Sequence, residues 1–216
     1  MTRIAGPPPR SNPIIRMTLR IARRKAAQMT GRETEQMIEP LEAFAHAPGL
    51  LLGYGMLELA TERARRVEPR LKELAVLKAA TIIECEYCID IGSSVAHRTG
   101  ISDEVLLALP RHSDSPLFSE RERLALDLAV AMTRVPVAVP GALFAELREH
   151  FDEAQLVELT SVIALENLRS RFNAALDIGS AGLAEGMVCA VPERVANTTR
   201  DAAVAQNGAP ASPAPA

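Results

Sequence analysis

The feature that most constrains the fold is the stretch LKELAVLKAATII at residues 71–83. It is largely apolar over more residues than a typical strand occupies, which favours a buried helix. Alternation of apolar and polar residues with a period of two is nowhere sustained, so β structure should be minor or absent. Since the chain has no tryptophan and only 3% aromatic residues, its core must consist mainly of Ala, Leu, Ile and Val. These observations predict an all-α fold.

Turn and cap residues divide the middle of the chain into further helices. We expect helices over residues 14–27, 50–65, 71–83, 141–150 and 153–177, and a short turn at 41–45 before Pro48. Ser119 with Glu122 forms the capping-box pattern that opens another helix, which should run to about residue 133. Ser102 should cap a short helix after Gly100 has ended the preceding one.

The two ends of the chain differ in composition from the middle. Three successive prolines and Asn12-Pro13 predict that residues 1–13 form a flexible lead. Residues 197–216 are mostly Ala, Pro, Ser, Asn and Gly, so they cannot bury enough apolar surface to become ordered and should form a disordered tail. Because no long linker interrupts residues 14–196, we expect a single domain there.

The charge distribution excludes several classes of partner. A net charge of −3 argues against a general nucleic-acid binder, although residues 1–32 carry eight Arg or Lys and no Asp or Glu. We expect this basic arm to pack its apolar side on the domain or on a neighbouring subunit. There is no apolar run of about 18 residues and no secretory signal pattern, so neither membrane insertion nor secretion is expected. Three cysteines fit a reducing compartment, and we expect a cytoplasmic protein.

Two of the cysteines, Cys85 and Cys88, form a C-x-x-C motif that one helix would bring onto one side. At a helix N-terminus, the free N–H groups and the helix dipole favour a thiolate, so the pair is typical of redox chemistry. The same spacing serves zinc, but zinc needs four ligands and no second C-x-x-C or H-x-x-x-H is present. A third interpretation is two buried small thiols. We expect neither metal nor cofactor, since no nucleotide-binding glycine motif is present either.

The segment LKELAVLKAATIIECEYCIDIGSSVAHRTGIS resembles the carboxymuconolactone decarboxylase superfamily, and within it the alkylhydroperoxidase D-like branch that carries C-x-x-C. The resemblance extends over about residues 40–190, through SERERLALDLAVAMTRVP and ELTSVIALENLRSRFNAAL. It implies a helical bundle that buries the cysteine helix near a subunit interface of a homo-oligomer, a trimer or a hexamer.

The resemblance also implies roles for individual residues. Cys88 is the expected attacking thiol, Cys85 the resolving thiol, and Glu73, twelve residues before Cys85, the base of a proton relay. The branch has a histidine four residues after the second cysteine, where this chain has Gly92. His97 should lie on the far side of the same helix, so it is not expected to replace the missing histidine.

A second polar group lies in the predicted helix over residues 153–177. Glu166, Ser170 and Asn173 share one face, and Asn167 and Arg171 lie next to it. Buried polar groups need partners, so the group should brace an interface or line a pocket. For a pocket, Asn167 and Arg171 are the best candidates.

The leading functional hypothesis is a peroxidase or thiol-disulfide oxidoreductase of the alkylhydroperoxidase, peroxiredoxin-like type. It would reduce organic hydroperoxides or disulfides and take electrons from an external dithiol, with activity weakened by Gly92. Two alternatives remain: a redox-responsive binding or scaffold protein with little catalysis, and a lactone decarboxylase working by acid-base chemistry.

Overall fold

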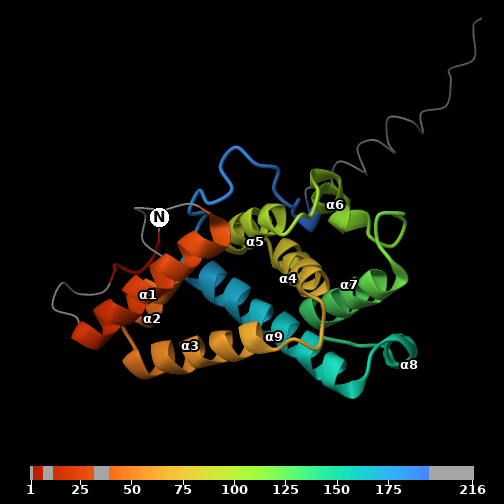
Figure 1. Cartoon of the computed structure of the whole chain (residues 1–216), viewed down its shortest axis with the longest axis horizontal. Helices are drawn as coiled ribbons and strands as arrows, with labels where there is room; N and C mark the ends of the chain where they lie inside the picture. The colour runs from red at the N-terminus through yellow and green to blue at the C-terminus, as the bar shows by residue number, and fades with distance from the viewer. Residues whose placement is uncertain (1, 7–11, 32–38, 195–216) are drawn as a thin grey trace, which may run out of the picture.

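The computed structural model describes residues 2–6, 12–31 and 39–194. In these residues the chain forms nine α-helices, one short 3-10 helix and no strand, which confirms the all-α prediction (Figure 1). The helices are α1 (Pro13–Thr30), α2 (Glu39–Phe44), α3 (Pro48–Arg63), α4 (Pro69–Ile83), α5 (Glu86–Arg98), α6 (Asp103–Ala108), η1 (Leu109–Arg111), α7 (Glu120–Thr133), α8 (Gly141–His150) and α9 (Glu153–Leu176). The tail predicted for 197–216 and most of the predicted N-terminal lead lie outside the described residues.

Local signals in the sequence explain where most helices begin and end. Proline occupies the first turn of α1, α3 and α4, where its missing N–H has no intrahelical partner to lose. Ser119 and Glu122 make both bonds of the predicted capping box, and Asp152 with Gln155 makes a second one at α9. Gly100, at φ +83°, follows α5 as expected.

The helix α4 is the centre of the fold. It packs against α5, α7 and α9, as Figure 1 shows. Its buried residues, Leu71, Leu74, Ala75, Leu77, Lys78, Ala79, Ala80 and Thr81, point in several directions around the helix axis. This confirms that the apolar stretch at 71–83 is a buried helix, as expected of a helix that is hydrophobic nearly all round.

The apolar core has two main parts that share α4. One surrounds the start of α5 and includes residues of α6 and of the segment after α9. The other lies between α4, α7, α8 and α9. A smaller third cluster joins α1 to α2 and α3, because Ile15 and Leu19 of the basic arm pack on Ala45 and Leu51. Two apolar residues of the arm therefore pack on the domain, whereas Ile14, Met17 and Ile21 are exposed.

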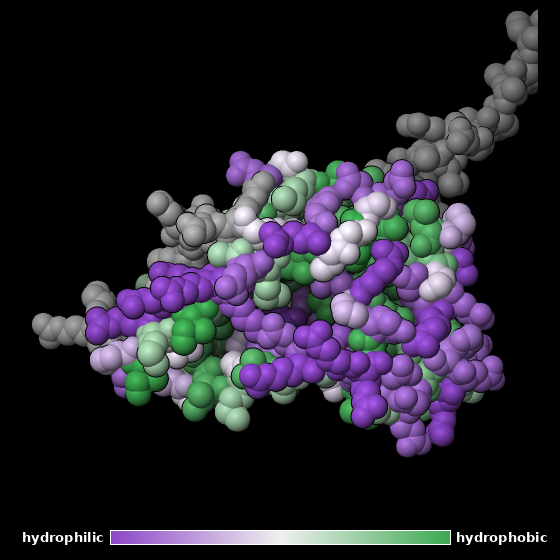
Figure 2. All heavy atoms as spheres, in the orientation of Figure 1, coloured by the Kyte–Doolittle hydropathy of each residue, from purple (hydrophilic) through white to green (hydrophobic). Residues whose placement is uncertain are grey.

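The helix α3 is much less covered than α4. Leu51 is its only buried residue, whereas five large apolar side chains of this helix are exposed. They are Leu50, Leu52, Met56, Leu57 and Leu59. In Figure 2 the lower left of the molecule, where α3 lies in Figure 1, shows several apolar residues at the surface.

Candidate functional site

The cysteine pair lies at the turn between α4 and α5. Only Glu84, in the left-handed conformation at φ 63°, and Cys85 separate the two helices. Cys85 is the N-cap of α5, and its sulfur accepts a hydrogen bond from the backbone N–H of Cys88 at 3.2 Å. The two residues form a disulfide with their Cα atoms 5.3 Å apart. The C-x-x-C motif is therefore an oxidised pair at a helix N-terminus.

Both sulfurs are buried and contact an amide side chain. Cys85 is 3% exposed and Cys88 6% exposed. The Nδ2 of Asn173, near the end of α9, lies 3.5 Å from the sulfur of Cys85 and 3.4 Å from that of Cys88, within hydrogen-bond reach for sulfur. Asn173 is itself buried, and its Oδ1 has no hydrogen-bond partner among the described residues.

Glu73 on α4 faces the next turn of α5. A β-carbon on Gly92 would lie 3.8 Å from Glu73 Oε1, so position 92 and this carboxyl are neighbours across the helix pair. The same β-carbon would lie 2.6 Å from Cδ2 of Leu77, too close for any side chain without repacking. Leu77 thus occupies the space that a side chain at position 92 would need.

The environment of Glu73 favours its neutral form. Burial raises the pKa of Glu73 to about 7, and the nearby Glu166 carboxyl adds to the rise while the Arg169 guanidinium opposes it. A carboxyl with this pKa can both accept and release a proton near neutral pH. The chain therefore holds, beside the cysteine helix, a carboxyl with a pKa near neutrality, although position 92 is glycine.

Glu166 belongs to a buried network that joins α9 to α3. It accepts hydrogen bonds from Ser170 at 2.7 Å and from Arg169 at 3.1 Å, and burial raises its pKa. Arg169 also bonds Glu58 through Nε at 2.7 Å. Burial, followed by the charge of Glu58, raises the pKa of Tyr54. These bonds fix the face of α9 from which Asn173 also projects.

Asn167 and Arg171, the predicted pocket or interface residues, contact the end of α7. Asn167 Nδ2 donates to Thr133 Oγ1 at 2.9 Å, and Arg171 donates to the carbonyl oxygen of Thr133 at 2.9 Å and to Asn167 Oδ1 at 3.3 Å. These bonds brace α9 against α7. The asparagine at the sulfurs is Asn173, which sequence periodicity had placed only on the neighbouring face.

The segment after α9 folds back over α5 and helps to cover the cysteine pair. The carboxylate of Asp90 accepts hydrogen bonds from the Ser180 hydroxyl at 2.9 Å and from the backbone N–H groups of Ala181, Leu183 and Ala184 at 2.9, 3.0 and 2.6 Å. Ile178 and Ala190 from the same segment join the apolar cluster around the cysteines. The chain buries its reactive pair with its own C-terminal region.

Other residues considered from the sequence lie apart from this arrangement. His97 bonds the carbonyl oxygen of Val188 at 2.8 Å and faces Asp103 at 3.5 Å. Cys189 is a free thiol whose pKa is raised by partial burial. Over the described ranges, no three Cys, His, Asp or Glu side chains gather as a metal site would require. No described helix has both the length and the apolar character needed to cross a membrane.

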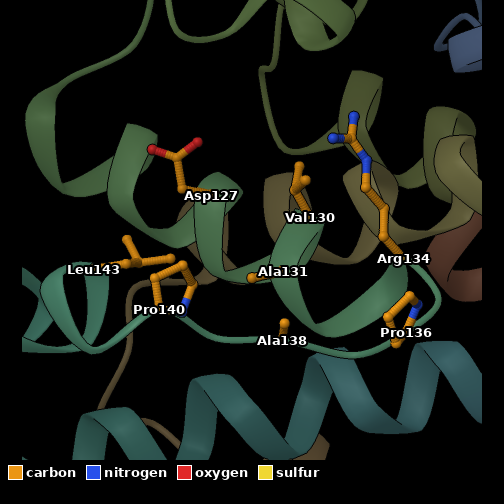
Figure 3. Close-up of a pocket in the computed structure, with 8 residues that line it drawn as sticks. All are labelled: Asp127, Val130, Ala131, Arg134, Pro136, Ala138, Pro140 and Leu143. Carbon is orange, nitrogen blue, oxygen red and sulfur yellow. The ribbon is translucent and has the colours of Figure 1, made fainter.

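A shallow surface pocket of about 460 Å³ lies between α7 and the chain that leads to α8. Figure 3 shows Asp127 and Arg134 projecting from α7 above the prolines of this connection. Its other lining residues are Val130, Ala131, Pro136, Ala138, Pro140 and Leu143. None of the residues around the cysteine pair lines it, so the pocket is separate from the candidate site.

Comparison with known proteins identifies a matching family and two similar bacterial proteins. The family model of the carboxymuconolactone decarboxylase family matches residues 48–131, which include Glu73 and both cysteines. Uncharacterized protein YnjA of Escherichia coli (strain K12) is 39% identical over 173 residues, covering 79% of this chain and 92% of YnjA. Uncharacterized protein YdfG of Bacillus subtilis (strain 168) is 30% identical over 106 residues, covering 49% of this chain and 72% of YdfG.

Solved structures share the fold at lower identity. An alanine variant of the debrominase Bmp8 in complex with 2,3,4-tribromopyrrole is 24% identical with a TM-score of 0.69, covering 84% of this chain and 94% of Bmp8. A peroxidase-related protein from Ralstonia eutropha JMP134, described as an alkylhydroperoxidase AhpD core, is 19% identical with a TM-score of 0.66. The match covers 83% of this chain and 92% of the Ralstonia protein. The fold is thus that of the AhpD-like helical proteins, as the sequence resemblance predicted. The motif, the fold and the extensive match to YnjA together show that this chain belongs to the carboxymuconolactone decarboxylase family.

Proposed function

We propose that this protein is a thiol-disulfide redox enzyme of the alkylhydroperoxidase type, which reduces hydroperoxides or disulfides through Cys88 and Cys85. The observation that carries the proposal is the C-x-x-C pair at the N-terminus of α5, joined as a disulfide. Glu73 supports it, because its pKa near 7 suits proton transfer at neutral pH. The proposal extends the family assignment to a particular chemistry.

The proposed reaction with a hydroperoxide has two steps. The Cys88 thiolate attacks the terminal peroxide oxygen, the O–O bond breaks, and the alkoxide leaves and takes a proton from Glu73 to become the alcohol. The thiol of Cys85 then attacks the sulfenic acid on Cys88, which forms the disulfide and releases water. Two electrons and two protons from an external dithiol restore the reduced pair.

The buried position of the pair sets a condition on this chemistry. With Cys85 3% and Cys88 6% exposed, a substrate reaches the sulfurs only if the covering segment after α9 or the end of α9 moves. Because position 92 is glycine and not the histidine of the family relay, Glu73 is the one residue assigned to proton transfer in this proposal. We therefore expect slower peroxide reduction than a member with the relay histidine would show.

The test is the loss of cumene hydroperoxide on mixing with fully reduced protein in the absence of other reductant. Wild-type protein should consume about one equivalent of peroxide and form the Cys85–Cys88 disulfide. Cys88→Ser should consume none, whereas Cys85→Ser should stop at a sulfenic acid that dimedone traps. Cys189→Ser is the matched control and should behave as wild type. Peroxide that persists with wild-type protein, or is lost equally with Cys88→Ser, would refute hydroperoxide reduction by this pair and leave disulfides as its substrates.

One observation favours a second candidate, a redox-responsive binding or scaffold protein. Position 92 is glycine and Leu77 fills the space beside it, so the histidine of the relay that the family resemblance implies has no counterpart there. In that case the disulfide should form with a general thiol oxidant and change assembly or binding, while peroxide is not consumed. The debrominase and the peroxidase-related protein share this fold, so the fold itself does not choose between chemistries. A lactone decarboxylase would instead keep its activity when both Cys85 and Cys88 are replaced by serine.

A further inference from the structure

The inference concerns Asn173, whose carboxamide contacts the reactive pair from α9. Its Nδ2 lies within 3.5 Å of both sulfurs, so one N–H-bearing nitrogen contacts both ends of the disulfide. Its Oδ1 is buried and has no hydrogen-bond partner in the part of the chain that the structure describes. A buried acceptor without a donor has lost its bonds to water without replacement, so the oxidised form leaves this oxygen in an unfavourable state.

The missing donor is one that the reduced pair supplies. The sulfurs of a disulfide carry no hydrogen, so neither can donate to Oδ1. Reduction to one thiolate and one thiol gives a charged acceptor for the N–H group and an S–H donor for the oxygen. A carboxamide has one donor end and one acceptor end, so it matches a pair with one thiolate and one thiol. It matches the fully protonated pair and the doubly ionised pair less well.

The position of Asn173 is fixed by its neighbours on α9. One turn earlier, Ser170 bonds Glu166 and Arg169 bonds Glu58, which holds this face of the helix against α3. The carbonyl oxygen of Asn173 accepts the backbone N–H of Ile178 at 3.0 Å, so the helix end is closed directly beyond it. The backbone that carries Asn173 is therefore held in place by bonds that do not involve the cysteine pair.

We infer that Asn173 is a catalytic residue that stabilises the half-ionised dithiol, donating from Nδ2 to the Cys88 thiolate and accepting the Cys85 thiol at Oδ1. The inference rests on the proposed redox function. In the reducing step an external dithiol becomes a disulfide and gives up two electrons and two protons. Both electrons and one proton stay on the pair, and the second proton leaves through Glu73 or solvent. Because a hydrogen bond to a thiolate is charge-assisted, Asn173 favours the reduced state.

Two variants of similar size test the inference. Asn173→Leu removes the donor and the acceptor, and Asn173→Asp replaces the donor by a carboxylate that repels a thiolate. We expect the midpoint of pH-dependent Cys88 alkylation in reduced protein to rise by about one pH unit in the Leu variant and by more in the Asp variant. The oxidised pair should also become harder to reduce in redox-buffer titrations. Asn167→Leu is the matched control, because it removes an amide that lies on α9, like Asn173, but bonds Thr133 of α7. It should change neither the alkylation midpoint nor the ease of reduction of the disulfide.

A measurement on the unmodified chain removes the dependence on variant folding. In ¹⁵N-labelled protein the side-chain amide protons of Asn173 should shift on reduction and then follow the alkylation midpoint as the pH is raised. The inference would be overturned if the folded variants have the same alkylation midpoint as wild type. It would also be overturned if the side-chain amide resonances of Asn173 do not shift on reduction. These readouts do not use peroxide, so a protein that does not consume peroxide but shows both shifts would refute hydroperoxide reduction and leave the role of Asn173 standing.

Discussion

At the scale of single residues, Glu73 links the stability of the protein to its chemistry. Its pKa of about 7 lies above its ordinary value of 4.5 because burial disfavours the charged form. A carboxyl whose pKa is raised on folding contributes stability that is fully present below about pH 4.5. That stability is lost as the pH rises through about 7, where the folded protein must ionise a buried group. The property that suits a proton carrier therefore lowers stability at neutral and basic pH.

Glu73→Gln should reveal this cost. Since glutamine does not ionise, the free energy of unfolding of the variant minus that of wild type should increase by about 1–3 kcal/mol between pH 4.5 and pH 8. Peroxide consumption by reduced protein should fall in the variant and lose the decline that deprotonation of Glu73, the proton donor to the alkoxide, causes above about pH 7. Urea denaturation at several pH values and the peroxide assay measure the two effects.

The control for this prediction is Glu149→Gln, which changes an exposed glutamate on α8. Its stability difference from wild type should stay constant over the same pH range. If Glu73→Gln also gives a constant difference, the carboxyl titrates near its ordinary pKa and is not the proton carrier.

At the scale of elements, the packing of α4 against α5 depends on Gly92. Alanine is more favourable than glycine inside a helix by about 1 kcal/mol. Here its β-carbon would lie 2.6 Å from Leu77, a fully buried core residue, and overpacking costs about 1–3 kcal/mol. The contact should outweigh helix propensity, so glycine is the residue that lets the two helices approach.

A double-mutant cycle tests this packing. Gly92→Ala should destabilise wild-type protein by about 1 kcal/mol, since overpacking exceeds the helix propensity gained. In the background of Leu77→Ala the same substitution should stabilise by about 0.5–1 kcal/mol, because the space is then open. Urea denaturation of the four oxidised proteins gives the coupling energy. Equal effects of Gly92→Ala in both backgrounds would show that Leu77 does not limit position 92.

The sequence predicted the elements better than the contacts between them. Caps, prolines and apolar periodicity are local, so the helices at α4, α7, α8 and α9 have bounds close to those expected. The pairing of Glu73 with the cysteine helix followed from the family resemblance. Periodicity placed Asn173 on a polar face of α9 but not against the sulfurs, because that contact depends on how α9 crosses α5. For the same reason it did not predict that Leu77 fills the space beside Gly92.

At the scale of the whole molecule, α3 has an apolar surface that residues 2–6, 12–31 and 39–194 leave exposed. The residues Pro48 to Leu57 include no charged side chain, yet Leu51 is the only buried residue of this helix. Monomeric proteins rarely expose large contiguous apolar patches, whereas interfaces between copies commonly bury them. An uncharged surface is also compatible with contact between identical copies. In a symmetric interface the same patch meets itself, and charged side chains there would bring like charges together. We propose that α3 is buried in the homo-oligomer that the family resemblance implies.

Two charges on this face should therefore weaken assembly. Leu52 and Met56 are 67% and 64% exposed and lie one helical turn apart. Because burying a large apolar side chain contributes about 1.5–3 kcal/mol, Leu52→Glu with Met56→Glu should raise the dissociation constant at least about 100-fold. Light scattering after size exclusion should show a trimer or hexamer for wild type and a smaller species for the variant at the same concentration. Val137→Glu, which alters a comparably exposed valine between α7 and α8, should assemble as wild type. A wild-type monomer at every concentration, or a doubly charged variant of unchanged mass, would refute the burial of α3 between copies of this chain.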